Sequence, residues 1–409
     1  MTHTQASEAF SRLFAQARQE PDSYDPFADF AILREQAPVF HDSQACTWHV
    51  FSYADVAALL RVETTTKTAI RAVFQHDLPH ESILWRHFEN TIFTTDTQRH
   101  RAQYDIFKRT LVPRFGGMYP RVKRITNAIF AAALQGGNPL EIVSRFSSLI
   151  PLNVIADWMG IDPSSYDQLR IWTEAVNAVF DPGGTQEQLA KATRAMEDFF
   201  AFFREHIEER HRRGGADLLT DLAREMQGDE LLSNCVTIFI AAHESVANTI
   251  SQGIIEFARR PDLLTLLREH PAYLNDLTSA LLRKNAATSV AYRQLTQPFA
   301  CANGVVIPAG AVVALWLASA NRDPEVFDHP DELRLGEAVN QRHLAFSPGS
   351  PHECIGAPLA RIEVRAAFET LLERTRGAFE LSSPVQMKPT TLFRGISEAL
   401  VGFTLSEQS

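Results

Sequence analysis

Apolar residues recur at intervals of three and four along most long segments of this 409-residue chain, a spacing that predicts amphipathic α-helices. The strongest helical patterns lie at residues 53–61, 119–134, 187–210, 234–258, 262–268 and 274–283. Strand-like patterns are few and short, at residues 48–52, 305–307 and 312–317. The pattern therefore predicts a mainly α fold with a small β region.

Neither an internal repeat nor a Gly/Ser-rich linker divides the chain, so we expect a single domain over residues 1–409, with 1–25 as a partly flexible N-terminal segment. The net charge of −10 argues against a dedicated nucleic-acid-binding protein. The polar N-terminus shows no signal peptide, and no apolar run approaches the ~20 residues that span a bilayer. Four cysteines without paired spacing fit a reducing compartment. We therefore predict a cytoplasmic protein without a membrane partner.

One cysteine, Cys354, lies in a Gly/Pro-rich loop that leads into a helical pattern from Leu359 onward. Gly356 and Pro358 suit the passage from loop to helix. A thiolate at a helix N-terminus is stabilised by the helix dipole and by free backbone N–H groups, so we expect a lowered pKa for Cys354. A thiolate of this kind can ligate heme iron. We interpret the other cysteines as small buried hydrophobic residues; they are Cys46, Cys235 and Cys301.

The sequence around Cys354 resembles the proximal loop of the cytochrome P450 family of heme-thiolate monooxygenases. Phe346 is followed three residues later by Gly349, His352 stands two residues before the cysteine, and Leu-Ala-Arg follows Gly356. The resemblance covers residues 26–405. It implies the cytochrome P450 fold, a helical domain with a small β-sheet region, in which heme b (iron protoporphyrin IX) is buried between an oxygen-side helix and the cysteine-loop helix. Cys354 would then be the axial metal ligand.

The segment 238–250 is the candidate oxygen-side helix, because it is apolar with polar residues at its middle. It resembles the family pattern Ala-Gly-x-Asp/Glu-Thr-Thr, which implies that Ala241 lies beside the heme and that Glu244 and Ser245 are catalytic in proton delivery. Ala242 replaces the usual glycine, and serine keeps a hydroxyl but lacks the β-branch of threonine. The alternative is a buried helix whose acid faces solvent.

The resemblance also implies which side chains bind the heme carboxylates, since buried carboxylates must be paired. Candidate donors are His100, Arg293 and His352. Tyr104 stands where the family has an arginine, so it would offer one hydrogen bond without a charge. The alternative is that the histidines and arginine are ordinary surface residues.

Two departures from the family pattern are visible. The family's Glu-x-x-Arg helix appears as Ala280 to Arg283, and Glu332 stands where a downstream arginine belongs. We hypothesise that Arg283 pairs with Glu332; the alternative is two independent losses. In addition, Phe346 and Cys354 are eight positions apart, whereas the family usually has seven, which either alters hydrogen bonding at the thiolate or is absorbed as a bulge.

The resemblance places a small-molecule substrate among residues 73–93, 238–241, 288–291 and 392–397, where apolar side chains are frequent. Within them, or just before them, possible carboxylate contacts are Arg71, Arg86 and His87. A ferredoxin-type electron donor would dock near Cys354, where we expect Arg109, Arg114 and Arg361.

Three functions remain open at this stage. The first is a monooxygenase in secondary-metabolite biosynthesis. The second is a heme-thiolate enzyme with peroxide-driven, dehydration, rearrangement or bond-forming chemistry. The third is a catalytically degenerate partner protein.

Overall fold

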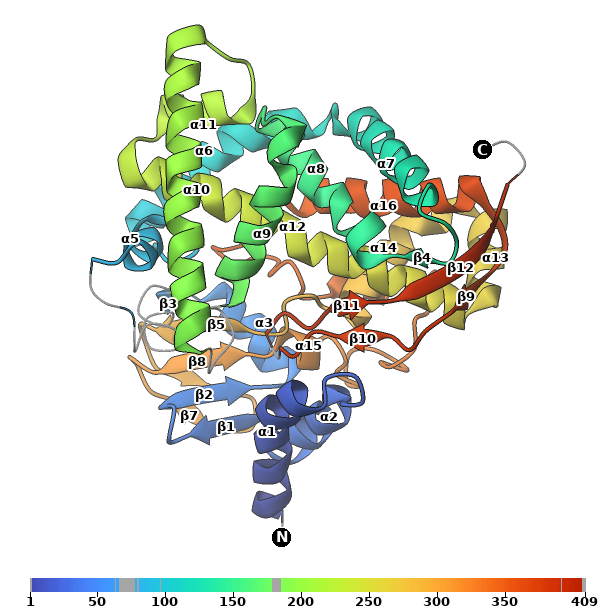
Figure 1. Cartoon of the computed structure of the whole chain (residues 1–409). Helices are drawn as coiled ribbons and strands as arrows, with labels where there is room; N and C mark the ends of the chain where they lie inside the picture. The colour runs from blue at the N-terminus through green and yellow to red at the C-terminus, as the bar shows by residue number, and fades with distance from the viewer. Residues whose placement is uncertain are drawn as a thin grey trace.

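The computed structural model describes residues 2–62, 64–65, 78, 81–95, 97–178, 185–390 and 392–406. Helices dominate these residues, and most of the long ones lie on one side of a small β region, whereas α1 and α2 pack elsewhere on that region (Figure 1). Their bounds are α1 (Thr2–Gln19), α2 (Pro26–Gln36), α3 (Tyr53–Arg61), α5 (Ile83–Asn90), α6 (Thr97–Phe115), α7 (Met118–Leu134), α8 (Leu149–Trp158), α9 (Tyr166–Asn177), α10 (Gln186–Arg213), α11 (Leu218–Glu225), α12 (Gly228–Arg259), α13 (Pro261–Glu269), α14 (Leu274–Lys284), α15 (Leu317–Ala320) and α16 (Ala357–Arg374).

The strands form one five-stranded sheet, in the order β1-β2-β8-β5-β3, and three smaller sheets. Within the larger sheet, β2 and β8 are parallel and the other pairs are antiparallel. The bounds are β1 (Val39–Asp42), β2 (Thr47–Val50), β3 (Thr64–Thr65), β4 (Leu140–Glu141), β5 (Ala291–Leu295), β6 (Phe299–Ala300), β7 (Val306–Ile307), β8 (Val312–Leu315), β9 (Thr375–Leu381), β10 (Gln386–Met387), β11 (Ile396–Glu398) and β12 (Leu400–Leu405).

The predicted fold class is confirmed, and each of the six predicted helices is present with ends that differ by at most a few residues. The largest difference is at α12, which starts at Gly228 rather than at residue 234. Its first turn carries Asp229 and Glu230, which favour a helix N-terminus although they add nothing to the apolar pattern. The predicted strand at 312–317 ends at Leu315, because the chain turns there and enters the short helix α15 at Leu317.

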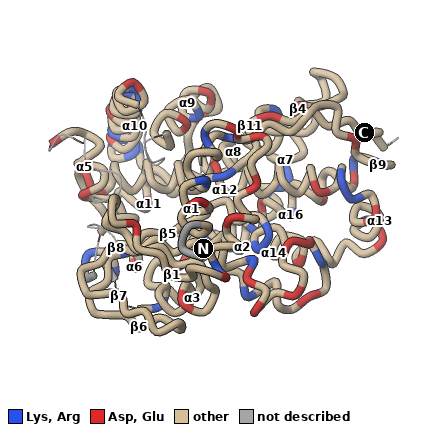
Figure 2. The backbone as a smooth tube through the Cα atoms, turned by 90° about the horizontal axis from the view of Figure 1, so that it is seen from below, with Lys and Arg blue, Asp and Glu red and all other residues tan. Residues whose placement is uncertain are grey.

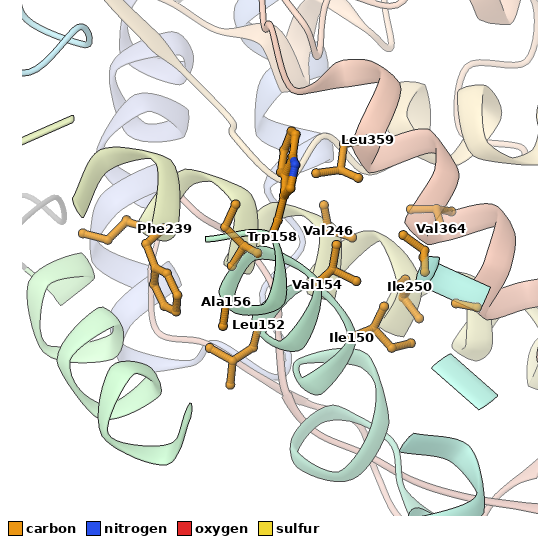
Figure 3. Close-up of a cluster of buried hydrophobic side chains, with 14 of the residues drawn as sticks. Ile150, Leu152, Val154, Ala156, Trp158, Phe239, Val246, Ile250, Leu359 and Val364 are labelled. Carbon is orange, nitrogen blue, oxygen red and sulfur yellow. The ribbon is translucent and has the colours of Figure 1, made fainter. Parts of the chain in front are cut away.

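Helix α12 is buried on almost every side and forms the centre of the main hydrophobic cluster. A helix that is apolar around its circumference is expected in the core of a large domain. Figure 3 shows its side chains against those of α8 and α16; the labelled residues are Ile150, Leu152, Val154, Ala156, Trp158, Phe239, Val246, Ile250, Leu359 and Val364. This packing fixes α12 relative to α16, the helix that follows Cys354.

The N-terminal segment forms α1, which packs on α2 and the β region. Phe10 and Leu13 are buried there, in the same cluster as Trp316 near the end of β8. Arg12 also pairs with Asp29 of α2. These contacts attach residues of the first 25 positions to the rest of the fold, while the single-domain organisation remains a prediction.

Gly253 allows α12 to approach α14 and α16 closely. A Cβ atom at this position would lie 2.2 Å from Cζ of Phe368 and 3.0 Å from Cδ1 of Leu281. Both side chains are fully buried and have little freedom to move. We expect Gly253→Ala to destabilise the protein by about 1–2 kcal/mol, because overpacking by ~1–3 kcal/mol exceeds the helix-propensity gain of up to ~1 kcal/mol.

The measurement is the urea midpoint at equal cofactor loading. Gly116→Ala is the matched control, since no atom lies within 4 Å of its added Cβ. An unchanged midpoint for the Gly253 variant would show that the helices can separate without cost.

Candidate active site

Cys354 lies at the end of the loop that enters α16. Its N–H donates to the carbonyl of Phe346 at 3.0 Å, and its own carbonyl accepts from Ala357 at 3.3 Å. The side chain is exposed, whereas Cys235 and Cys301 are buried. The prediction of a buried residue is thus confirmed for Cys235 and Cys301 but wrong for Cys46, which is exposed. Of Cys235, Cys301 and Cys354, only the thiol of Cys354 is accessible to a bound group.

The pKa of Cys354 differs from the sequence-based expectation. Desolvation by the surrounding protein atoms raises the pKa of the Cys354 thiol, although the side chain keeps exposed surface. The backbone N–H groups of Gly356 and Ala357 act in the predicted direction and lower it, but their effect is smaller. The net shift is therefore opposite to the sequence-based expectation, because desolvation outweighs the two backbone N–H groups. A coordinating metal deprotonates a thiol in either case.

The extra residue of the cysteine loop is accommodated by two consecutive turns. Ser350 N–H donates to Ser347 at 3.1 Å, and Glu353 N–H donates to Ser350 at 3.0 Å. The hydroxyl of Ser350 also accepts from the N–H of His352 at 3.1 Å. The insertion therefore extends the turn before Cys354 and keeps the Cys354–Phe346 hydrogen bond, which favours the second of the two sequence-based alternatives.

Three predicted carboxylate ligands lie close together beside this loop. The ring centroids of His100 on α6 and His352 are 3.9 Å apart. Burial, together with the positive charges of Arg293 and His100, lowers the pKa of His352 to about 2. Arg293, on β5, is itself buried. The two side chains that contribute to this shift, Arg293 and His100, are both basic, and basic side chains can bind carboxylates.

Tyr104 lies next to this basic group, as the sequence indicated. Its hydroxyl donates to the backbone carbonyl of Glu353 at 3.3 Å. Its contact is therefore with the cysteine loop, and a direct role toward a heme carboxylate stays a prediction. Arg101, one turn from it, is exposed.

On α12, the predicted oxygen-side residues are adjacent and partly accessible. Ala241 is exposed although it lies at the middle of the helix, and the hydroxyl of Ser245 donates to its carbonyl at 3.3 Å. The helix continues without interruption through Ala242. This face of α12 therefore presents a small apolar residue and a hydroxyl to open space.

The carboxylate of Glu244 is bound on both oxygens. Lys388, just after β10, contacts Oε1 at 2.5 Å, and Asn177 at the end of α9 donates to Oε2 at 2.5 Å. The Glu244 side chain is 15% exposed. Sequence analysis missed both partners, because they lie 144 and 67 positions away and carry no local signal.

The hypothesis that Arg283 pairs with the carboxylate of Glu332 was wrong. Arg283 is buried and donates to backbone carbonyls of Pro330 at 2.7 Å and Glu332 at 2.6 Å. Its Nε donates to Oδ1 of Asn340 at 3.0 Å. The Glu332 side chain is 62% exposed and points to His329 instead. Neutral oxygens therefore replace the missing glutamate.

Two predicted substrate contacts are engaged elsewhere. Arg86 forms a bidentate ion pair with Asp229 of α12, with N–O distances of 2.7 and 3.0 Å. His87 is buried in the core, where desolvation lowers its pKa to about 3. Neither is placed to meet a substrate carboxylate. Arg71 lies outside the described residues. The same holds for residues 73–77 and 79–80 of the predicted pocket segment 73–93.

The arginines predicted to attract an electron donor are mostly paired within the protein. Arg109 contacts Glu225 at 2.9 Å, and Arg114 contacts Asp221 of α11. Arg361 donates to the hydroxyl of Ser279 at 2.8 Å. Figure 2 shows Lys and Arg interspersed with Asp and Glu along the elements in view. A docking surface near Cys354 stays a prediction.

These residues fit a heme. The Cys354 thiol is accessible at the start of α16. On α12, Ala241 and the hydroxyl of Ser245 face open space. The basic cluster near the thiol supplies donors suited to two carboxylates. The combination of a mainly helical fold with this site defines a heme-thiolate class of protein.

Comparisons with known proteins agree with this class. The sequence model of the family Cytochrome P450 matches residues 268–401. Cytochrome P450 107B1 of Saccharopolyspora erythraea is 30% identical over 316 residues, which cover 75% of this chain and 76% of the relative. The chain therefore belongs to the cytochrome P450 family, whose members are heme-dependent oxidoreductases.

Two further proteins show the extent of the similarity. Erythromycin C-12 hydroxylase of Saccharopolyspora erythraea is 26% identical over 351 residues, covering 84% of this chain and 85% of the relative. The solved structure of P450BioI in complex with hexadec-9Z-enoic acid ligated acyl carrier protein has a TM-score of 0.85 and 26% identity. It covers 93% of this chain and 98% of that one. Within the described ranges, none of the helices combines the length and hydrophobicity needed to cross a membrane.

Proposed function

We propose that this protein is a monooxygenase that holds heme b through the Cys354 thiolate and oxidises a small organic molecule in secondary-metabolite biosynthesis. The observation that carries the proposal is the accessible Cys354 at the start of α16, beside a cluster of basic side chains. A relative named as an erythromycin hydroxylase supports the substrate class.

Each proposed site residue has a separate role. Cys354 would hold the heme through its thiolate, and Gly356 lies beside the sulfur, since a Cβ atom added there would be 3.9 Å from Sγ. The carboxylates of the cofactor are bound by donors from three elements, namely His100, Arg293 and His352. Heme, when bound, supplies the activation of dioxygen.

The residues of α12 have two other roles, which are to leave room for the substrate and to deliver protons. Ala241 leaves room for the cofactor and the substrate, because its side chain is small. The Ser245 hydroxyl holds a proton near the reacting oxygen, and Glu244 exchanges protons with it. Lys388 and Asn177 each occupy one site on a different carboxylate oxygen, so the exchange uses the remaining lone pairs or follows release of one of these donors.

The remaining partners follow from the same chemistry. Electrons come from a ferredoxin-type protein that docks on the Cys354 side, and we propose that both proteins act in the cytoplasm. P450BioI was solved with an acyl chain on a carrier protein, so both free and carrier-bound acyl chains belong among the substrates to be screened.

The test is the absorption spectrum of the purified protein, reduced under carbon monoxide. We expect the strongly red-shifted Soret band of thiolate ligation, its loss in Cys354→Ser and its retention in Cys46→Ser, which changes another exposed cysteine. A Cys354→Ser protein that keeps the band would refute the assigned ligand.

A second experiment separates oxygen insertion from other heme chemistry. Compounds that change the heme spin state are incubated with ¹⁸O₂, a surrogate ferredoxin, its reductase and NADPH as the source of electrons. Incorporation of one labelled oxygen atom per product supports the monooxygenase. Turnover without label, or with peroxide alone, would instead favour non-insertion or peroxide-driven chemistry.

A further inference from the structure

One face of α6 carries a column of side chains that leads to the cysteine loop. His100, Tyr104 and Lys108 are spaced by four residues, so they lie one above another on the helix. The Lys108 ammonium is 4.8 Å from the centre of the Tyr104 ring, close enough for a cation–π contact. The rings of Tyr104 and His100 stack with centroids 5.8 Å apart.

The column touches the loop at two points. His100 contacts His352, with ring centroids 3.9 Å apart. The Tyr104 hydroxyl donates to the Glu353 carbonyl at 3.3 Å, in the peptide unit that joins Glu353 to Cys354. Tyr104 is a neutral donor, because a phenol is protonated at physiological pH and burial raises its pKa further.

The lengthened loop presents this carbonyl to Tyr104. The turn from Ser350 to Glu353 uses the Glu353 N–H, and the Glu353 side chain folds back to accept from the N–H of Gly349 at 2.9 Å. The N–H and the side chain of Glu353 are thus both bound inside the loop, and its carbonyl is the group that contacts α6. Among the described contacts, Tyr104 is the recorded hydrogen-bond donor to it.

We propose that Tyr104 is a positioning residue for Cys354, anchoring the peptide unit before the axial cysteine through its hydroxyl. The role rests on the proposed function, in which Cys354 ligates the heme. Two departures from the family pattern, the tyrosine in place of arginine and the one-residue insertion, then form a single structural feature. The longer loop is held by a neutral donor from α6.

The test uses the heme-loaded protein and the variant Tyr104→Phe, which removes the hydroxyl and keeps the ring between His100 and Lys108. We expect amide hydrogen exchange of residues 350–354 to become about two- to five-fold faster, as for the loss of one modest hydrogen bond. We also expect the reduced carbon monoxide complex to lose its thiolate band faster by a similar factor. Heme transfer to apomyoglobin should stay at the wild-type rate.

Tyr53→Phe is the matched control. The Tyr53 hydroxyl also donates to a backbone carbonyl, that of Arg342, at 2.8 Å, and it lies on α3. Its removal should leave exchange of residues 350–354 and the thiolate band unchanged.

Deletion of Pro351 tests the coupling to the insertion. If the tyrosine and the longer loop form one feature, Tyr104→Phe should have a smaller effect in the shortened loop than in the natural one, a non-additivity expected for residues in contact. Equal effects in both loops would refute the coupling. Should the deletion variant not fold, the single variant and its control still decide the anchoring role.

The outcomes separate this proposal from the proposed function. Wild-type exchange and a stable thiolate band in Tyr104→Phe would overturn the role of Tyr104 alone. Faster heme transfer with unchanged loop exchange would also overturn it, and would assign the hydroxyl to a heme carboxylate. A wild-type protein without a thiolate band would overturn the proposed function and this role together.

Discussion

Replacing Arg283 with methionine is expected to lower the free energy of unfolding by about 3 kcal/mol or more. The guanidinium donates to three close acceptors, on Pro330, Glu332 and Asn340, whereas methionine replaces only the apolar stem of arginine and has no donor. Each buried acceptor that loses its partner costs about 1–3 kcal/mol. The measurement is the urea midpoint at equal heme loading, together with the heme content of the purified protein.

Glu332→Gln is the matched control for Arg283→Met. Only the backbone carbonyl of Glu332 contacts Arg283, and its carboxylate is 62% exposed, so we expect the midpoint to change little. Destabilisation by Glu332→Gln as large as that by Arg283→Met would mean that the two side chains form an ion pair in solution, contrary to the structure.

This arginine shows where inference from sequence ends. The sequence correctly showed that the usual glutamate is missing, since Ala280 stands in its place. It then suggested Glu332, because this acid stands where the family has an arginine and because carboxylates are the counter-ions that a sequence makes visible. Backbone carbonyls are present at every position and leave no mark in the pattern, so a cage of carbonyls with Asn340 could not be predicted.

The parts that were predicted depend on local signals. Helix periodicity located α12 and α14, and the spacing around Cys354 located the loop at the start of α16. The grouping of His100, Arg293 and His352 was expected from the family resemblance, and the structure brings these side chains together. Their roles toward a heme remain proposals.

Features that depend on long-range packing were missed or assigned differently. His87 was predicted as a contact for a substrate carboxylate, but it lies on α5 with its side chain buried in the core. Arg86 is neutralised by Asp229, 143 positions away. The partners of Glu244 come from α9 and from the segment after β10. In each case tertiary contacts determine whether a charged group is available for chemistry.

Replacing Glu244 with glutamine is expected to reduce oxygen-dependent turnover by about 10²-fold or more, the usual range for the loss of a positioned acid or base. Peroxide-driven turnover should fall much less, because hydrogen peroxide brings the oxygen, both electrons and both protons. The measurement is the ratio of the oxygen-dependent rate to the peroxide-driven rate on one substrate. That substrate is chosen because it shifts the heme spin state.

Lys388→Met distinguishes the acid from its ion pair, since it removes the contact at 2.5 Å and leaves the Glu244 carboxylate in place. If Glu244 transfers protons, Lys388→Met keeps most of the oxygen-dependent rate, because loss of one donor to the carboxylate does not impair proton exchange between Glu244 and Ser245. If Glu244 serves only to tie α12 to Lys388, both variants lose turnover and stability equally. Equal losses by both oxygen- and peroxide-driven routes would therefore contradict a proton-transfer role and make Glu244 a structural residue of α12.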